Sequence, residues 1–219
     1  MAIAEKSTYL LSLANEMKIY WPQNRLINIC CHGHSVPSGY FDTPAAFPFE
    51  SYPHLLHKIL KDRFTFASLN VIVTAIGGEG SESGAKRFTD DVLCHKPDLI
   101  TIDYGLNDRG LGLVRAEKAW SAMAQLAQER GIKVILMTPT MDINAPDPEK
   151  GADLKRHVEQ IRVIASRYEV GLADSYAAYE KYISDGGALT DILSWANHPN
   201  RRGHELVRDE LFRWFPVEY

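Results

Sequence analysis

The sequence predicts an α/β protein, with a parallel sheet of about five strands between two layers of helices, as a single domain over residues 1–219. Short runs of apolar and β-branched residues alternate with segments of about 10 to 16 residues whose apolar positions recur at helical spacing. Glycine or proline follows most of the apolar runs, where a strand has to end. Alternation of this kind produces right-handed βαβ units with parallel strands, hence a three-layer α/β/α arrangement.

The chain begins with a predicted amphipathic helix that flanks the domain within residues 1–22, because Tyr9, Leu13 and Met17 recur at helical spacing before Pro22. Predicted strands and helices then alternate to the end of the chain. The strands are expected at residues 26–31, 68–76, 98–104, 132–137 and 170–173. The helices are expected at residues 52–62, 81–95, 115–130, 154–168, 176–184 and 203–215.

A long loop rich in proline, glycine and aromatic residues follows the first predicted strand. Its aromatic residues are Tyr40, Phe41, Phe47 and Phe49. Loops of this length are uncommon, and many of them line binding sites. The aromatic residues are therefore expected either to form a wall of a site or simply to pack on the domain.

The composition excludes several classes of function. The formal net charge of −4 gives no basic surface for nucleic acid, and no apolar run approaches the ~20 residues of a membrane span. The first residues lack the basic and apolar regions of a secretion signal. Three cysteines, two of them adjacent in a predicted strand, suit reduced thiols better than disulfides. We therefore expect a cytoplasmic protein without stable membrane association.

Residues suited to acyl transfer follow the predicted strands. Ser35 comes just after the first, Gly78 after the second and Asn107 after the third, while His198 lies near the C-terminus. The carboxyl ends of parallel strands meet at one edge of a sheet, so these residues can come together. A serine hydroxyl needs a base within hydrogen-bond reach, which His198 can supply. The amides of Ser35 and Gly78 and the Asn107 side chain could bind an oxyanion.

Four segments at these places resemble, in order, the four motif blocks of the SGNH hydrolases, also called the GDSL esterase/lipase family. The segments are Gly33–Val36, Ile76–Glu79, Gly105–Asp108, and His198–Asn200 with Gly203–His204. The resemblance implies a flavodoxin-like sheet and hydrolysis of esters or thioesters through an acyl-serine. It also implies no metal and no organic cofactor.

Two positions depart from the family pattern. His34 stands where the family usually has an aspartate before the serine. Trp195 stands three residues before the histidine, where the family usually has the aspartate of the catalytic triad. His198 could then be oriented by the Trp195 backbone carbonyl, by Asp191, or by no group at all. We favour the carbonyl, which can accept the imidazole N–H and so select its tautomer.

The resulting hypothesis is a serine esterase in which Ser35 attacks the acyl carbon and His198 moves the proton. The substrate is a small-molecule ester, with a short acyl group such as acetyl on a polar or carbohydrate alcohol, because the chain lacks a long apolar lid or an obvious membrane-docking segment. One alternative is a thioesterase or lysophospholipase. Another is a binding protein on the same fold, which the missing aspartate keeps open.

Overall fold

The computed structural model describes residues 2–216, which contain one sheet of five parallel strands in the order β2-β1-β3-β4-β5. The strands are β1 (Leu26–Gly33), β2 (Ser68–Val73), β3 (Leu99–Asp103), β4 (Lys133–Met137) and β5 (Gly171–Ala173). All five predicted strands are present, and this order is the flavodoxin-like one. β2 is added on one side of β1, whereas β3, β4 and β5 are added on the other side. The strand order therefore switches between β1 and β3, and sheets of this kind bind ligands at that point.

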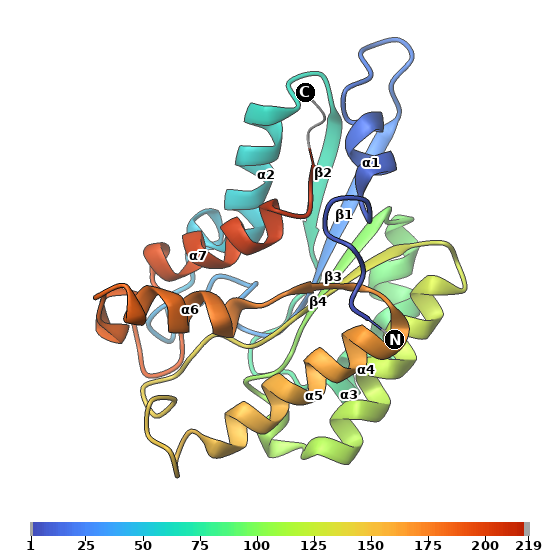
Figure 1. Ribbon diagram of the computed structural model, residues 1–219. Coiled ribbons are helices and arrows are strands. Elements are labelled where there is room, and N and C mark those ends of the chain that lie inside the picture. The colour runs from blue at the N-terminus through green and yellow to red at the C-terminus, as the bar shows by residue number, and fades with distance from the viewer. Residues whose placement is uncertain (1, 217–219) are drawn as a thin grey trace.

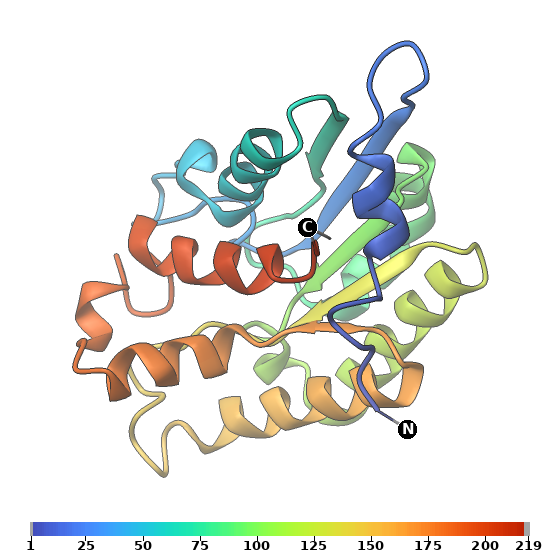
Figure 2. The same ribbon diagram turned by 45° about the horizontal axis from the view of Figure 1, so that its top comes forward.

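Helices cover both faces of the sheet, which confirms the three-layer prediction (Figure 1). One layer contains α1 (Leu11–Glu16), α2 (Tyr52–Arg63), α6 (Ser175–Ser184) and α7 (Arg201–Phe212). The other contains α3 (Ser81–Arg87), α4 (Leu113–Gln128) and α5 (Ala152–Tyr168). Figure 2 shows the same separation from a second direction, with α2 and α7 on one side of the strands and α4 on the other.

Each layer has its own hydrophobic core because successive strand residues point to opposite faces. In β1, Ile29 and Cys31 belong to the core under α2 and α7, whereas Cys30 belongs to the core under α4. The central strands are therefore apolar on both faces, as is typical of parallel sheets covered on both sides.

Two predicted helices differ from the observed ones. The N-terminal helix covers only Leu11–Glu16. Tyr20 and Trp21 continue the apolar spacing beyond its end, but their rings are exposed and do not pack on the core. The helix predicted at residues 81–95 is α-helical only as far as Arg87 and continues as a π-helical turn and then a 3-10 turn.

Beyond these differences, the fold brings the loops that follow β1, β2 and β3 to one edge of the sheet. The end of β1 pairs with the end of β3, with Gly33 opposite Asp103. A Cβ atom on Gly33 would lie 2.4 Å from the Asp103 carbonyl oxygen, so the close approach of these two strands requires glycine. Within residues 2–216, no helix is both long and apolar enough to cross a membrane.

Candidate active site

Ser35 and His198 meet at the edge of the sheet although 163 positions separate them in the chain. Oγ of Ser35 lies 3.0 Å from Nε2 of His198, and both side chains are almost fully buried. Ser35 is placed by the turn that follows β1, and His198 by the segment before α7, where the Asn200 side chain accepts from the Gly203 N–H and caps the helix. The distance is that of a hydroxyl hydrogen-bonded to an imidazole.

The other ring nitrogen of His198, Nδ1, lies 3.0 Å from the backbone carbonyl oxygen of Phe41. A carbonyl can only accept, so Nδ1 carries the hydrogen and Nε2 is free to accept from Ser35. The Phe41 ring stacks on the His204 ring, with the two centroids 5.2 Å apart. Burial lowers the pKa of His204 to about 3, so its neutral Nδ1 accepts from the Tyr52 N–H and holds the stack in place.

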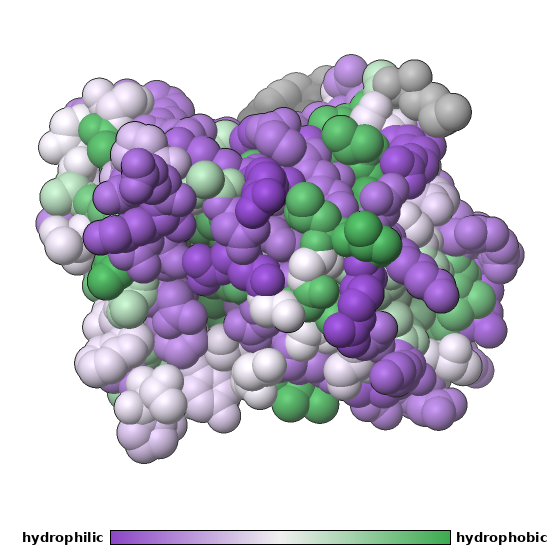
Figure 3. All heavy atoms as spheres, turned by 90° about the horizontal axis from the view of Figure 1, so that it is seen from below, coloured by the Kyte–Doolittle hydropathy of each residue, from purple (hydrophilic) through white to green (hydrophobic). Residues whose placement is uncertain are grey.

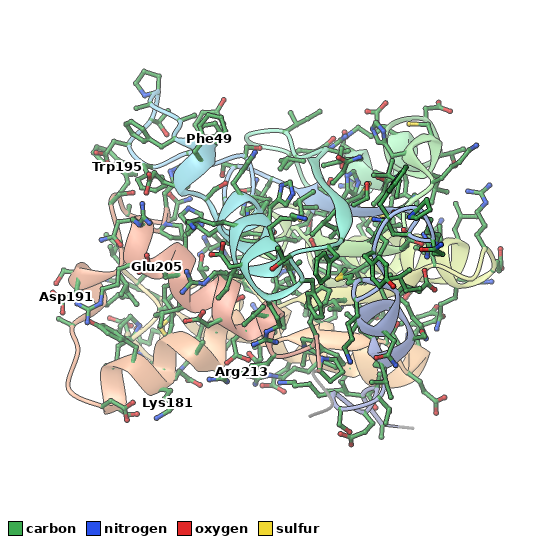
Figure 4. All side chains as sticks on the ribbon, turned by 90° about the horizontal axis from the view of Figure 1, so that it is seen from above. Phe49, Lys181, Asp191, Trp195, Glu205 and Arg213 are labelled. Carbon is green, nitrogen blue, oxygen red and sulfur yellow. The ribbon has the colours of Figure 1, made fainter. Side chains whose placement is uncertain are left out.

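The prediction that the Trp195 carbonyl accepts from His198 is therefore wrong, although a backbone carbonyl does fill this place. The Ser194 N–H donates to the His198 carbonyl oxygen at 3.0 Å, which closes a tight turn between them. This turn leaves Trp195 at its tip with 58% of the side chain exposed. Figure 4 shows Trp195 at the periphery of the molecule, at the same corner as Phe49.

Asp191 does not reach His198 either. Its carboxylate accepts from the Ala188 N–H at 3.0 Å and from the Tyr182 hydroxyl at 3.3 Å, which closes the turn before residue 192. Figure 4 shows its side chain on the outer edge, apart from Trp195. Asp191 therefore has a local structural role.

Burial is the main cause that lowers the pKa of His198 below its ordinary value of 6.5. The hydrogen bond to the Phe41 carbonyl opposes this shift, while the neighbouring His34 ring adds to it. A lowered pKa keeps the imidazole neutral near pH 7, which is the form that can accept a proton from a hydroxyl.

The backbone N–H groups of Ser35 and Gly78 have no acceptor among residues 2–216. Gly78 has φ +79°, a conformation that favours glycine, and it turns the loop after β2. The Asn107 side chain donates through Nδ2 to the Glu79 carbonyl oxygen at 2.9 Å, which leaves its second hydrogen available. All three residues line one cavity together with His198, so three donors are free to meet a ligand oxygen there.

A buried polar network holds the loop that carries Gly78. Nε of Arg87 donates to the Glu79 carboxylate at 2.9 Å, and the Tyr104 hydroxyl donates to the same carboxylate at 3.0 Å. The Tyr104 hydroxyl also lies 3.0 Å from Nε2 of His32. Because Glu79 in turn accepts from Asn107, the loops after β2 and β3 are fixed against each other.

The cavity has a volume of ≈ 380 Å³. The residues that line it are Ser35, Tyr40, Thr43, Gly77, Gly78, Asn107, Asn197 and His198. Tyr40 is thus part of a site wall, one of the two expectations for the aromatic loop, whereas Phe47 and Phe49 are not among the lining residues. Thr43 was not singled out by the sequence pattern, because a threonine in an irregular loop has no distinguishing signal.

Arg109, two residues after Asn107, has its partners outside the cavity. Arg109 donates to the Asp142 carboxylate at 2.7 Å and to the Leu106 carbonyl oxygen at 3.0 Å, and it is not a lining residue of the cavity. Over the described part of the chain, no three His, Cys, Asp or Glu side chains gather in a way that could hold a metal ion.

Residues 31–206 match the model of the GDSL-like Lipase/Acylhydrolase family. The chain belongs to this family. The resemblance carried by the four sequence motifs is thereby confirmed, and the chain is an ester-hydrolysing enzyme. A curated relative from Bacillus subtilis (strain 168), an uncharacterized lipoprotein named YqeF, is 27% identical over 178 residues, which cover 66% of this chain and 72% of the relative.

Solved structures of related fold include Axe2, an acetylxylan esterase from Geobacillus stearothermophilus. It superposes with a TM-score of 0.77 at 19% identity, over 92% of this chain and 97% of its own. LAE5, an alpha/beta hydrolase from the metagenome of Lake Arreo, superposes with a TM-score of 0.74 at 20% identity, over 91% of this chain and 97% of its own. At these identities the likeness establishes the fold.

Figure 3 shows one face of the molecule, on which hydrophobic residues lie in small groups among hydrophilic ones. Hydrophilic and hydrophobic residues are interspersed on this face, as on an ordinary protein surface.

Proposed function

We propose that the enzyme is a serine esterase that removes short acyl groups, such as acetyl, from a polar or carbohydrate alcohol. The observation that carries this proposal is the 3.0 Å contact between Ser35 Oγ and His198 Nε2 beside a cavity with free N–H donors. This combination of nucleophile, base and oxyanion donors is the one that acyl transfer requires.

In the proposed mechanism, Ser35 Oγ attacks the acyl carbon and His198 Nε2 takes the hydroxyl proton. The carbonyl electron pair moves to the oxygen, which accepts from the N–H groups of Ser35 and Gly78 and from Nδ2 of Asn107. The intermediate expels the alcohol, which receives the proton from His198, and an acyl-serine remains. Water then attacks the acyl-serine by the same steps and restores Ser35.

The Phe41 carbonyl takes the place of the carboxylate that orients the histidine in a triad. A neutral carbonyl selects the same tautomer but stabilises the imidazolium less than a carboxylate does. In Axe2, by contrast, the catalytic mutants are at a serine, a histidine and an aspartate three residues before that histidine. Trp195 occupies the corresponding position here.

The cavity supports the choice of a short acyl group. Small or polar residues, among them Thr43, Gly77 and Asn197, line much of it, so it offers little apolar wall to a long acyl chain. Trp195, two residues before the lining residue Asn197, presents a largely exposed indole. A flat apolar ring suits the C–H face of a sugar, and Axe2 is an acetylxylan esterase.

The proposal is tested with a panel of esters from acetyl to long acyl chains on the same alcohol, together with acetylated sugars. We expect kcat/KM to be highest for acetyl and to fall as the chain lengthens. Preference for long chains would replace this substrate assignment by the lysophospholipase one, and preference for thioesters by a thioesterase. Turnover that survives Ser35→Ala would refute the nucleophile.

We also propose a cytoplasmic location and one domain over residues 1–219. The thiols of Cys30, Cys31 and Cys94 are all free, which suits a reducing compartment. The Bacillus subtilis relative is named a lipoprotein, which favours the opposite location. Fractionation of cells that produce the full-length protein decides between them, since recovery with the membranes would contradict the proposal.

A further inference from the structure

Ser35 Oγ has a second imidazole beside it. Nδ1 of His34 lies 3.3 Å from Ser35 Oγ, on the ring of the residue that precedes the nucleophile. His34 is buried and directly follows Gly33, the last residue of β1. The single hydroxyl hydrogen of Ser35 therefore has two nitrogen acceptors within reach, His198 at 3.0 Å and His34 at 3.3 Å.

The backbone determines which nitrogen of His34 can accept. The Val36 N–H donates to His34 Nδ1 at 3.3 Å, and a backbone N–H can only donate. Nδ1 therefore carries a lone pair, and the neutral ring carries its hydrogen on Nε2. Both contacts of Nδ1, with Ser35 and with Val36, agree with this tautomer.

A buried carboxylate faces the other side of the same ring. Nε2 of His34 lies 3.4 Å from Oδ1 of Asp103, and the two side chains are 1% and 6% exposed. Among residues 2–216, His34 is the basic residue whose nitrogen lies within 4 Å of the Asp103 carboxylate, whose other oxygen accepts from the Tyr52 hydroxyl at 3.3 Å. Nε2 makes no well-aligned hydrogen bond in this resting arrangement. Contacts of catalytic groups are often long before substrate binds.

We propose that His34, supported by Asp103, is a second proton acceptor for Ser35. The order of groups is carboxylate, imidazole and hydroxyl, the same order as in a catalytic triad. The chain thus lacks a carboxylate behind His198 but has one behind His34. This inference rests on the proposed function, because it assigns a further role at the same serine.

The step is the following. The bond from Ser35 Oγ to the acyl carbon forms, the carbonyl π pair moves to the oxygen, and the hydroxyl proton passes to Nδ1 of His34. The imidazolium that results donates through Nε2 to the Asp103 carboxylate. An alkoxide leaving group still needs a proton from His198, whereas fluoride leaves a fluorophosphonate with the bonding electrons and needs none. Fluorophosphonate labelling of Ser35 therefore measures deprotonation of the nucleophile alone.

The test is a double-mutant cycle on the labelling rate of Ser35, with His34→Asn and His198→Ala made singly and together. Asparagine keeps an acceptor for the Val36 N–H at the Nδ1 position but takes up no proton. We expect His198→Ala to retain slow labelling of Ser35. In that background, His34→Asn should lower the labelling rate by about tenfold or more. When His198 is present, His34→Asn should lower the labelling rate by a smaller factor.

Asp103→Asn should act like His34→Asn in the His198→Ala background, and it replaces that variant if circular dichroism shows His34→Asn to be unfolded. His32→Asn is the matched control, because His32 is also buried in β1 but contacts Thr74 and Tyr104 instead of Ser35. The factor by which His32→Asn lowers the labelling rate of Ser35 should be the same with His198 present and in the His198→Ala background.

Equal factors for His34→Asn in both backgrounds, or no labelling of His198→Ala at all, would overturn the role of His34 and leave the esterase proposal standing. Absence of label on Ser35 in the unmodified enzyme would instead count against the esterase proposal itself.

Discussion

Nδ1 of His198 lies 3.0 Å from the carbonyl oxygen of Phe41, a residue 157 positions earlier in the chain. This contact replaces a side-chain carboxylate by a backbone group, so the orientation of the base depends on the conformation of the loop after β1. The stack of Phe41 on His204 then links this loop to α7, which directly follows the segment of His198.

Asp191→Ala is expected to leave kcat and KM within about twofold of the unmodified enzyme, because the carboxylate accepts from the Ala188 N–H and the Tyr182 hydroxyl and does not reach His198. The measurement is steady-state kinetics on an acetyl ester, with a thermal unfolding curve to detect any loss of stability. A loss of turnover without a loss of fold would identify Asp191 as the group that orients His198.

Asn107→Ala is expected to lower kcat by roughly 10²- to 10³-fold, because it removes one donor to the oxyanion. It also removes the bond to the Glu79 carbonyl oxygen, so part of the loss could come from a displaced loop. Asn107→Asp keeps the size of the side chain but loses both N–H donors, and a thermal unfolding curve of each variant shows whether the lost bond to Glu79 has disturbed the structure. Equal activity of Asn107→Asp and the unmodified enzyme would exclude Asn107 from the oxyanion hole.

The pH dependence of kcat/KM is expected to show an apparent pKa below 6.5. His198 accepts a proton only when neutral, and burial lowers its pKa in the free enzyme. Activity should therefore persist as the pH falls from 7 towards 6.5, and decline at lower pH as the imidazole becomes protonated. The measurement is a pH–rate profile at low substrate concentration. An apparent pKa above 6.5 would contradict this environment for His198.

Trp195→Ala is expected to raise KM for acetylated oligosaccharides several-fold and to leave kcat/KM for a small acetyl ester almost unchanged. The indole is exposed at the tip of its turn and makes no contact that orients His198. Phe49→Ala is a matched control, because Phe49 is also exposed at this corner of the molecule but follows a different strand (Figure 4). An equal loss of kcat/KM on both substrates would indicate that Trp195 helps to position His198.

The parts of the fold that were predicted correctly depend on regular spacing along the chain. The runs that form β1 and β3 are mostly apolar, and the helix at residues 152–168 has clear amphipathic spacing. The N-terminal helix was overpredicted because Tyr20 has the right spacing but packs against Phe66 near the surface. Spacing alone does not distinguish a helix from a loop whose aromatic residues pack locally.

The site also has a part that the sequence pattern predicts and a part that only the folded chain shows. The meeting of strand ends was enough to predict that Ser35, Gly78, Asn107 and His198 come together at one cavity, while their roles in acyl transfer stay a prediction. The Phe41 carbonyl could not be found, because every residue has a carbonyl and only the path of the loop selects one. The contact of Asp103 with His34 required knowledge that β1 and β3 are neighbours, which the order of strands along the chain does not reveal.

The most direct test of the proposed mechanism is to identify the covalent intermediate on Ser35. The enzyme is mixed with an excess of an activated acetyl ester, quenched in acid during turnover, digested and examined by mass spectrometry. We predict an acetyl group on the peptide that contains Ser35, and no acetylation of the same peptide from Ser35→Ala. Acetylation at another residue, or steady turnover by Ser35→Ala, would contradict the account.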